Sequence, residues 1–416
     1  MTDPAFSTIA ALLKRLTALM LRGSGEGTLE ISDAVQRVAT AYGATAVLLV
    51  LPDSVLLVVR FAGNESTIVI NERAEVPRLD QLTTLRQLIH AIEAGSVPLE
   101  QAMHQLQLLE AAPPLYPPWA TVAGVTLLSL GFGLTLQATW QEAIASLVLG
   151  TLVGLLALLP RAQPKLSHLM PFVAATIVSA LVLALYAPAG LRGAPINLMI
   201  PALLYFIPGD FISASMLELA HGRVAAGAIR LVHALFQLLT LAVGVTLGGI
   251  LVGTHPNEAF RTAVTPEFGA WVLVVGWVIF AAGMVWCMSI RWRDFGWVVT
   301  MILFADAVQE AGTLVLGELG STFIAGAAVA CVAGLLARNV TRPPYLVLML
   351  GAFFVLTVGT TGLDGLSSLA DGDLARGFTS VADMFGIASA LSLGLLTGNI
   401  IESLFETAKS VRKSVR

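Results

Sequence analysis

Charged residues are scarce in this sequence. The chain of 416 residues is 56% hydrophobic and only 12% charged, and its mean hydropathy is +0.83. Ordinary soluble domains carry about 25% charged residues, which they need to cover their surface. The composition therefore excludes a wholly soluble protein, and the small net charge of −4 gives no sign of a nucleic-acid partner.

Cysteine is almost absent as well. Cys287 and Cys331 both lie inside apolar runs, which is typical of thiols packed against helices or lipid. The chain contains neither a CxxC nor an HExxH spacing, the usual signs of a metal site. We therefore expect no disulfide framework, no metal and no cofactor.

The first 22 residues lack the features of a signal peptide. Lys14 and Arg15 interrupt the apolar positions, and no small-residue cleavage site follows. Apolar residues recur at helical spacing, namely Leu12, Leu13, Leu16, Leu19 and Met20. We expect an amphipathic helix that packs on the residues behind it.

Residues 1–115 predict a small cytoplasmic α+β domain. Its expected elements are a helix over 29–42, strands over 46–51, 55–61 and 66–70, and helices over 80–94 and 98–110. The turn signal Pro52-Asp53-Ser54 separates the first two strands. The proline-rich segment 113–118 predicts a stiff hinge, after which Trp119 begins the hydrophobic region as an interfacial aromatic residue.

Long apolar stretches follow the hinge. Each holds roughly twenty residues, enough to cross about 30 Å of hydrocarbon at 1.5 Å per residue. The ten expected spans cover 119–137, 143–160, 169–187, 196–216, 227–252, 269–290, 295–316, 321–338, 345–366 and 378–401. The fold class is therefore mostly α, a polytopic membrane protein in a lipid bilayer.

Basic residues predict the orientation. The loops expected on the inner side carry Arg161, Lys165, Arg223, Arg291, Arg293, Arg338 and Arg342, and the tail adds Lys409, Arg412, Lys413 and Arg416. The outer loops carry only Arg192, Arg261 and Arg376. This bias predicts a multi-pass protein of the cell (cytoplasmic) membrane with both termini in the cytoplasm.

Glycines repeat at a shift of 150 residues. The matching pairs are Gly209 with Gly359, Gly222 with Gly372, Gly227 with Gly377, Gly244 with Gly394, and Gly248 with Gly398. Chance would give about one such pair. The shift covers five helices, an odd number, so the halves 116–253 and 254–416 would be inverted relative to each other. A 5+5 inverted repeat is typical of secondary transporters, whose substrate sites lie where helices break.

The expected breaks can be placed. Pro208-Gly209-Asp210, with Ser213 one turn further on, interrupts the fourth span, and Gly359-Thr360-Thr361 stands at the equivalent place in the second half. Proline removes a backbone donor and glycine tolerates unusual dihedrals. The freed backbone groups could bind the carboxylate or ammonium of a substrate. The alternative is a kink that serves packing alone.

Ionisable residues inside apolar spans are costly and usually functional. Asp306, Gln309 and Glu310 share one helix face, and Arg230, His233 and Gln237 share another. His233 matches Asp383 at the shift of 150. Asp306, Glu310, Asp383 and His233 are therefore candidates for proton coupling, and the acids also for binding a substrate ammonium.

Structural pairing is the alternative for these groups, for example of Arg230 with an acid across the bundle. We expect three further charged or titratable residues, Glu218, His221 and Arg223, to be solvated at a helix end.

Several motifs together resemble the threonine/serine exporter family. They are Gly23-Ser24-Gly25-Glu26, Ala41-Tyr42-Gly43-Ala44, Ile207-Pro208-Gly209, the block from Leu217 to Arg223, and Gly227-Ala228-Ile229-Arg230-Leu231. The chain differs at Leu29-Glu30-Ile31, where the family has Arg-Val-Glu, and at Val358-Gly359, where a proline-glycine pair is expected. The resemblance implies a cytoplasmic N-terminal domain, ten membrane helices, and export of L-threonine or L-serine driven by protons.

Two other functions remain open. A membrane-anchored hydrolase would use the candidates Ser24, Asp80, His90 and His104, which belong to no nucleophile motif. Alternatively, the N-terminal domain is a regulatory or assembly module whose strands pair between subunits of a homo-oligomer.

Overall fold

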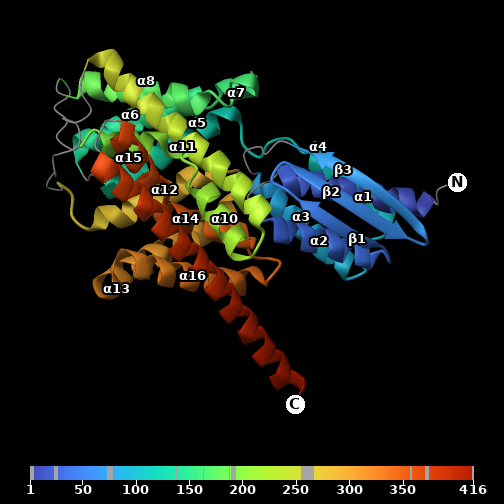
Figure 1. Cartoon of the computed structure of the whole chain (residues 1–416). Coiled ribbons are helices and arrows are strands. Elements are labelled where there is room, and N and C mark those ends of the chain that lie inside the picture. Colours follow the sequence, from blue (N-terminus) through green and yellow to red (C-terminus); the bar gives the residue numbers. More distant parts are fainter. Residues whose placement is uncertain are drawn as a thin grey trace.

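The computed structural model describes residues 4–22, 27–72, 78–136, 139–162, 164–186, 188, 194–253, 267–356, 358–370 and 374–414. A large helical bundle carries a smaller unit of helices and strands at one end (Figure 1). The last helix extends past the bundle to the C-terminus, as Figure 1 also shows.

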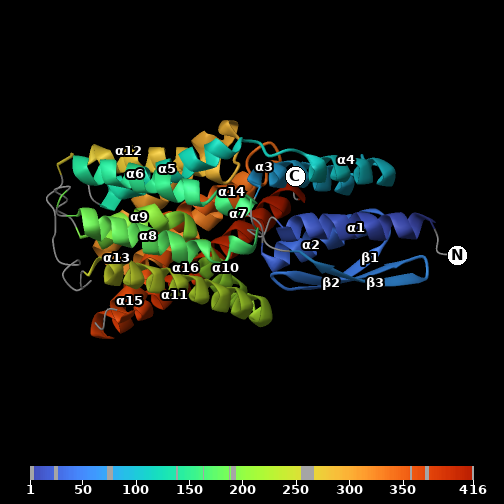
Figure 2. The same ribbon diagram turned by 90° about the horizontal axis from the view of Figure 1, so that it is seen from above.

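Residues 4–111 form what we call the N-terminal unit. Its elements are α1 (Pro4–Arg22), α2 (Thr28–Ala41), β1 (Thr45–Val50), β2 (Ser54–Phe61), β3 (Asn64–Asn71), α3 (Leu79–Glu93) and α4 (Leu99–Ala111). The strands form an antiparallel sheet in the order β1-β2-β3. Buried and less buried residues alternate along β2, because one face of the sheet packs on α1 and α2 (Figure 2). The predicted elements are confirmed to within a few residues.

The apolar face of α1 lies in the core of this unit. Leu12, Leu13 and Leu16 are buried in a hydrophobic cluster that also contains Ile31 of α2 and Leu57 of β2. The expected packing of this helix on the residues behind it is confirmed.

The bundle contains the remaining elements. They are α5 (Pro118–Leu136), α6 (Trp140–Leu156), α7 (Leu159–Ala162), η1 (Pro164–Leu166), α8 (Met170–Leu185), α9 (Ile196–Leu203), η2 (Leu204–Phe206), α10 (Gly209–Ala220), α11 (Val224–Val252), α12 (Trp271–Cys287), η4 (Trp292–Asp294), α13 (Phe295–Ala337), α14 (Tyr345–Val355), α15 (Val358–Ala370) and α16 (Leu374–Ser414).

By length and composition, five helices of the described residues could cross a membrane, α1 among them, or up to seven if each of two bent pairs counts as one span. Three shorter helices, α6, α8 and α12, are also apolar. The chain is therefore a polytopic membrane protein.

The helix α13 is a hairpin. Gly317 has φ 69° and ψ −176°, a conformation that favours glycine. The Gln309 side chain donates to Thr322 Oγ1 over 3.1 Å, and Thr313 Oγ1 donates to Ser321 Oγ over 3.1 Å. Residues 13 and 8 positions apart would be roughly 20 and 12 Å apart along a straight helix. The chain therefore reverses at Gly317, between the expected spans 295–316 and 321–338.

Glycines bring α5 and α12 into close contact, and the contacts are reciprocal. A Cβ added at Gly131 would lie 2.6 Å from the carbonyl oxygen of Gly276, and one at Gly276 would lie 2.8 Å from that of Gly131. The pair Gly124 and Gly283 repeats this pattern, at 2.9 and 2.6 Å. Only glycine permits backbones to approach this closely.

The crossing of α8 with α11 has a counterpart between α13 and α16. A Cβ at Gly244 would meet the Phe172 carbonyl at 2.7 Å, and one at Gly248 would meet the Thr176 carbonyl at 2.6 Å. In the second crossing, Gly394 meets the Phe323 carbonyl and Gly398 meets the Ala327 carbonyl. Two of the glycine pairs matched at the shift of 150, Gly244 with Gly394 and Gly248 with Gly398, therefore make matching contacts.

Candidate functional site

The first break separates α9 and α10. The two segments Ile196–Phe206 and Gly209–Ala220 are bent by 64°, because Ile207 is extended (φ −75°, ψ 119°) and Pro208 has no N–H to continue the helix. The Phe206 carbonyl accepts a hydrogen bond of 2.7 Å from the Gln237 side chain of α11. The predicted break is confirmed, and α11 satisfies one backbone group that it frees.

Asp210 and Ser213 stabilise the start of α10. The Asp210 carboxylate accepts the N–H groups of its own backbone and of Phe211, and Arg230 attracts it electrostatically. Ser213 Oγ donates to the Gly209 carbonyl over 2.9 Å. Asp210 therefore neutralises the positive end of α10, so its carboxylate is itself a possible partner for a cation.

The second break lies between α14 and α15. Segments Tyr345–Val355 and Thr360–Ser368 are bent by 41°, and residue 357 is outside the described residues. A Cβ at Gly362 would lie 2.9 Å from Leu238 of α11 and would also contact Met384 of α16.

One turn of α11 contacts both the first break and α15, the helix that follows the second break. Gln237 bonds to the first break, and its neighbour Leu238 lies opposite Gly362 in the second turn of α15. Gly359, Thr360 and Thr361 lie in the first turn of α15, and both threonine side chains are half-buried.

Asp306 and Glu310 form a separate group. Asp306 is half-buried on α13, where it accepts a hydrogen bond from the Trp277 side chain of α12 and faces the charge of Glu310. Glu310 itself is exposed. The expected sharing of one helix face by these two acids agrees with this geometry.

His233 and Asp383 both occupy exposed positions, on α11 and α16. The His233 ring lies edge-on to Phe211 of α10, with 6.2 Å between ring centroids. Exposure here includes surface that lipid would cover.

The expectation for Glu218 was wrong. Glu218 is 6% exposed rather than solvated, and its Oε2 lies 3.6 Å from Nε of Arg230, which is 4% exposed. His221 is exposed and Arg223 is half-buried. The sequence held one signal for the pair, because a lone arginine inside an apolar span needs a nearby acid.

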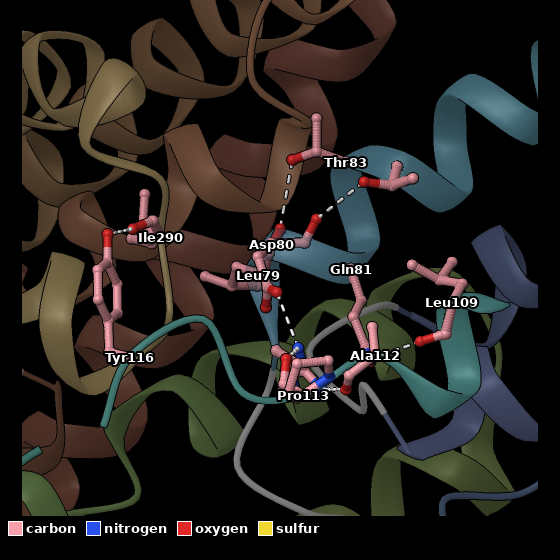
Figure 3. Close-up of polar contacts among 11 residues, drawn as sticks. Leu79, Asp80, Gln81, Thr83, Leu109, Ala112, Pro113, Tyr116 and Ile290 are labelled. Atoms are coloured by element: carbon pink, nitrogen blue, oxygen red, sulfur yellow. Dashed lines mark hydrogen bonds and ion pairs between the residues drawn. The ribbon is translucent and has the colours of Figure 1, made fainter. Parts of the chain in front are cut away.

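The segment that joins the N-terminal unit to α5 is fastened at several points (Figure 3). Arg78 donates to the carbonyls of Ala112 (2.8 Å) and Pro113 (2.9 Å) and to Asp80 (2.9 Å). Tyr116 Oη donates to the Ile290 carbonyl over 2.8 Å, and burial raises the pKa of its hydroxyl, which keeps it a donor.

Among the described residues, the hydrolase candidates Asp80, His90 and His104 are not assembled into a site. Asp80 is paired with Arg78, His90 lies 3.5 Å from Glu93, and His104 is exposed on α4. Ser24 lies outside the described residues.

An apolar helical bundle with two broken helices packed on a third is typical of membrane transporters. A family model described as "Putative threonine/serine exporter" matches residues 12–252, more than half of the chain. The chain therefore belongs to the threonine/serine exporter family.

Two bacterial proteins named as threonine/serine exporters are similar in sequence to this chain over most of its length. The "Probable threonine/serine exporter" of Mycobacterium tuberculosis is 26% identical over 406 residues, covering 94% of this chain and 75% of the relative. The "Threonine/serine exporter" of Corynebacterium glutamicum is 24% identical over 404 residues, covering 92% and 80%.

"Pheromone-regulated membrane protein 10" of Kluyveromyces lactis is 25% identical over 263 residues, covering 57% of this chain and 26% of the relative. No solved structure matches.

Proposed function

We propose that the chain is a secondary active exporter of small hydroxy amino acids, L-threonine and L-serine, driven by the proton-motive force. The observation that carries the proposal is that residues 237–238 of α11 contact the first break and the start of α15, beside the second break, in a member of this family. The names of the two bacterial relatives supply the substrate class.

The architecture that we propose is ten spans in two inverted halves of five. Gly276 follows Gly124 by 152 positions, as Gly283 follows Gly131. Exchanging the halves converts the contact of Gly131 with Gly276 into the contact of Gly283 with Gly124, and both added Cβ atoms would lie 2.6 Å from the facing carbonyl. A pseudo-two-fold axis between α5 and α12 accounts for this reciprocity.

We place both termini in the cytoplasm. The N-terminal unit bonds to the chain at Glu218, Met288 and Pro343, and Tyr116, just beyond the unit, bonds to Ile290. These residues adjoin the loops whose arginines predict the inner side. Because one compact unit contacts all of these regions, they are best placed on the same side of the membrane. In this topology the unit is a cytoplasmic domain.

The substrate site that we propose lies between the two breaks. The amides at the start of α15 face a zwitterion's carboxylate favourably, since a helix N-terminus attracts anions. Asp210 is positioned to accept the ammonium, because its carboxylate lies at the first break. Ser213, Thr360 and Thr361 would supply hydroxyl groups, and rocking of one half against the other would alternate access.

Proton coupling is assigned to the acids outside the breaks. Asp306 is the first candidate because it is half-buried, bonded to Trp277 and close to the charge of Glu310. Asp383 and His233, exposed on α16 and α11, are further candidates.

Reconstituted liposomes test the function directly. The purified protein should take up labelled L-serine or L-threonine saturably, and an imposed pH gradient should drive accumulation. Protein-free liposomes and a labelled amino acid without a hydroxyl are the controls. Absence of saturable uptake of either substrate contradicts the substrate class, and uptake indifferent to the gradient contradicts proton coupling.

A further inference from the structure

The N-terminus of α2 is capped by a residue from another part of the chain. Gly27 at the N-cap has no side chain to accept the first amides, and the Thr28 N–H donates to Glu218 Oε1 over 3.1 Å. The two residues are 190 positions apart, and Thr28 is fully buried. A carboxylate at a helix N-terminus is favourable because it accepts an amide and faces the positive end of the dipole.

The other oxygen of Glu218 faces the membrane helices. It lies 3.6 Å from Nε of Arg230, and Arg230 also attracts Asp210 at the first break. Charges of alternating sign therefore run from the N-terminus of α2 through Glu218 and Arg230 to Asp210. Glu218 and Asp210 stand about two turns apart on the same helix.

This arrangement constrains where α10 can lie. A buried carboxylate is stable only while its partners satisfy it, and loss of one partner is strongly unfavourable. Glu218 has one partner in the N-terminal unit and one in α11. A shift of α10 relative to either separates the carboxylate from a partner.

The same N-terminal unit is attached to the second half of the chain. The Leu79 N–H donates to the Met288 carbonyl (3.4 Å), and Arg86 donates to the Pro343 carbonyl (3.4 Å). Tyr116, just beyond the unit, bonds to Ile290. Thr28 therefore links the second half, through the N-terminal unit, to a broken helix of the first half.

We propose that Glu218 is a positioning residue for transport: its bond to the α2 amide transmits the placement of the N-terminal unit to α10 and holds the first break in the arrangement seen here. The inference rests on the proposed function, since it assigns that break a role in transport. Movement of one half against the other must strain either the bond between Thr28 and Glu218 or the bonds of the unit to Met288 and Pro343.

A proline substitution isolates this bond. Thr28→Pro removes the donor while keeping the helix, because proline is well accepted at the first helical position. Gly27 has φ −67° and ψ 159°, the extended conformation that a residue before proline adopts. Thr28→Val is the matched control, because it keeps the N–H and removes a hydroxyl oxygen that has no hydrogen-bond partner in the described part of the chain.

Two measurements are made on the full-length protein in lipid nanodiscs and liposomes. Hydrogen exchange over residues 209–220 reports the stability of α10 without any substrate. Initial rates of serine and threonine transport give kcat and KM separately. Loss of a hydrogen bond to a charged group corresponds to roughly a tenfold or larger change in an equilibrium.

We expect Thr28→Pro to accelerate exchange in α10 about tenfold and to change kcat by a similar factor, with KM within about twofold because the contacts at the break remain. Thr28→Val should behave as wild type.

Glu218→Gln is the second variant, in case Thr28→Pro does not accumulate. It keeps an acceptor for the amide but loses the charge, and should also accelerate exchange in α10. Its control is Glu402→Gln, which removes a charge from the more exposed pair with Arg338 (31% and 20% exposed).

Equal exchange in Thr28→Pro and Thr28→Val overturns the inference, as does a kcat that neither Thr28→Pro nor Glu218→Gln alters. If Thr28→Pro does not accumulate, wild-type exchange in Glu218→Gln overturns it. A wild-type protein that moves neither amino acid instead refutes the proposed function, while the exchange result still decides whether Glu218 holds α10.

Discussion

At the crossing of α5 and α12, alanine substitutions of two glycines related by the pseudo-two-fold axis should lower the free energy of unfolding by the same amount. Gly131 and Gly283 are the tighter pair, since a Cβ at either would lie 2.6 Å from a facing carbonyl oxygen; ordinary contact begins at 3.4 Å. The helices would have to separate by roughly 0.8 Å. Overpacking of this kind costs about 1–3 kcal/mol, and replacing a helical glycine returns about 0.5–1 kcal/mol. We expect a net loss of up to about 2.5 kcal/mol for each variant.

The free energy of unfolding in mixed micelles, titrated with a denaturing detergent, measures this loss. Gly296→Ala is the matched control, because a Cβ at Gly296 meets nothing within 4 Å and should stabilise α13 slightly. The double variant Gly131→Ala with Gly283→Ala should lose less than the sum of the two, because one separation of the helices accommodates both methyl groups.

Unequal losses for Gly131→Ala and Gly283→Ala, beyond the error of the titration, would refute a pseudo-two-fold axis between α5 and α12. If Gly131→Ala and Gly283→Ala are no less stable than Gly296→Ala, the close crossing itself is refuted.

Three further changes test the site and the linker. Gln237→Leu leaves the Phe206 carbonyl without its donor. We therefore expect a stability about 1–3 kcal/mol lower in detergent titration and slower transport in liposomes. Unchanged stability and transport would show that this hydrogen bond does not support the break. Arg78→Ala frees the two linker carbonyls and should speed proteolysis near residues 112–117, whereas Arg60→Ala, in an exposed ion pair, should not. Asp306→Asn keeps an acceptor for its indole partner but cannot carry a proton, so transport should lose its dependence on the pH gradient; retained dependence removes Asp306 from the pathway.

The local features of the chain were predictable because their causes are local. Proline and glycine at 208 and 209 break a helix wherever it lies, and the break is found there. The strands and helices of the N-terminal unit follow from apolar spacing and turn residues. The reversal at Gly317 was anticipated as a boundary between two spans, although the sequence did not reveal the hydrogen bonds that join its arms.

The partners of buried polar groups were not predictable in the same way. Glu218 stands beside a charged loop, where solvation was the natural expectation, and its burial depends on α2, which is remote in sequence. Trp277 as the donor to Asp306 likewise results from the packing of α12 on α13. Spacing identifies residues that share a face, but tertiary contacts decide what that face meets.

The reversal of α13 has a consequence for biogenesis. Its arms are joined at Gly317 with almost no intervening chain, and side chains bond across the turn. We therefore expect the two arms to enter the bilayer as one helical hairpin, because side-chain hydrogen bonds across the turn join them. An added residue at this turn should then disturb assembly of the nascent chain.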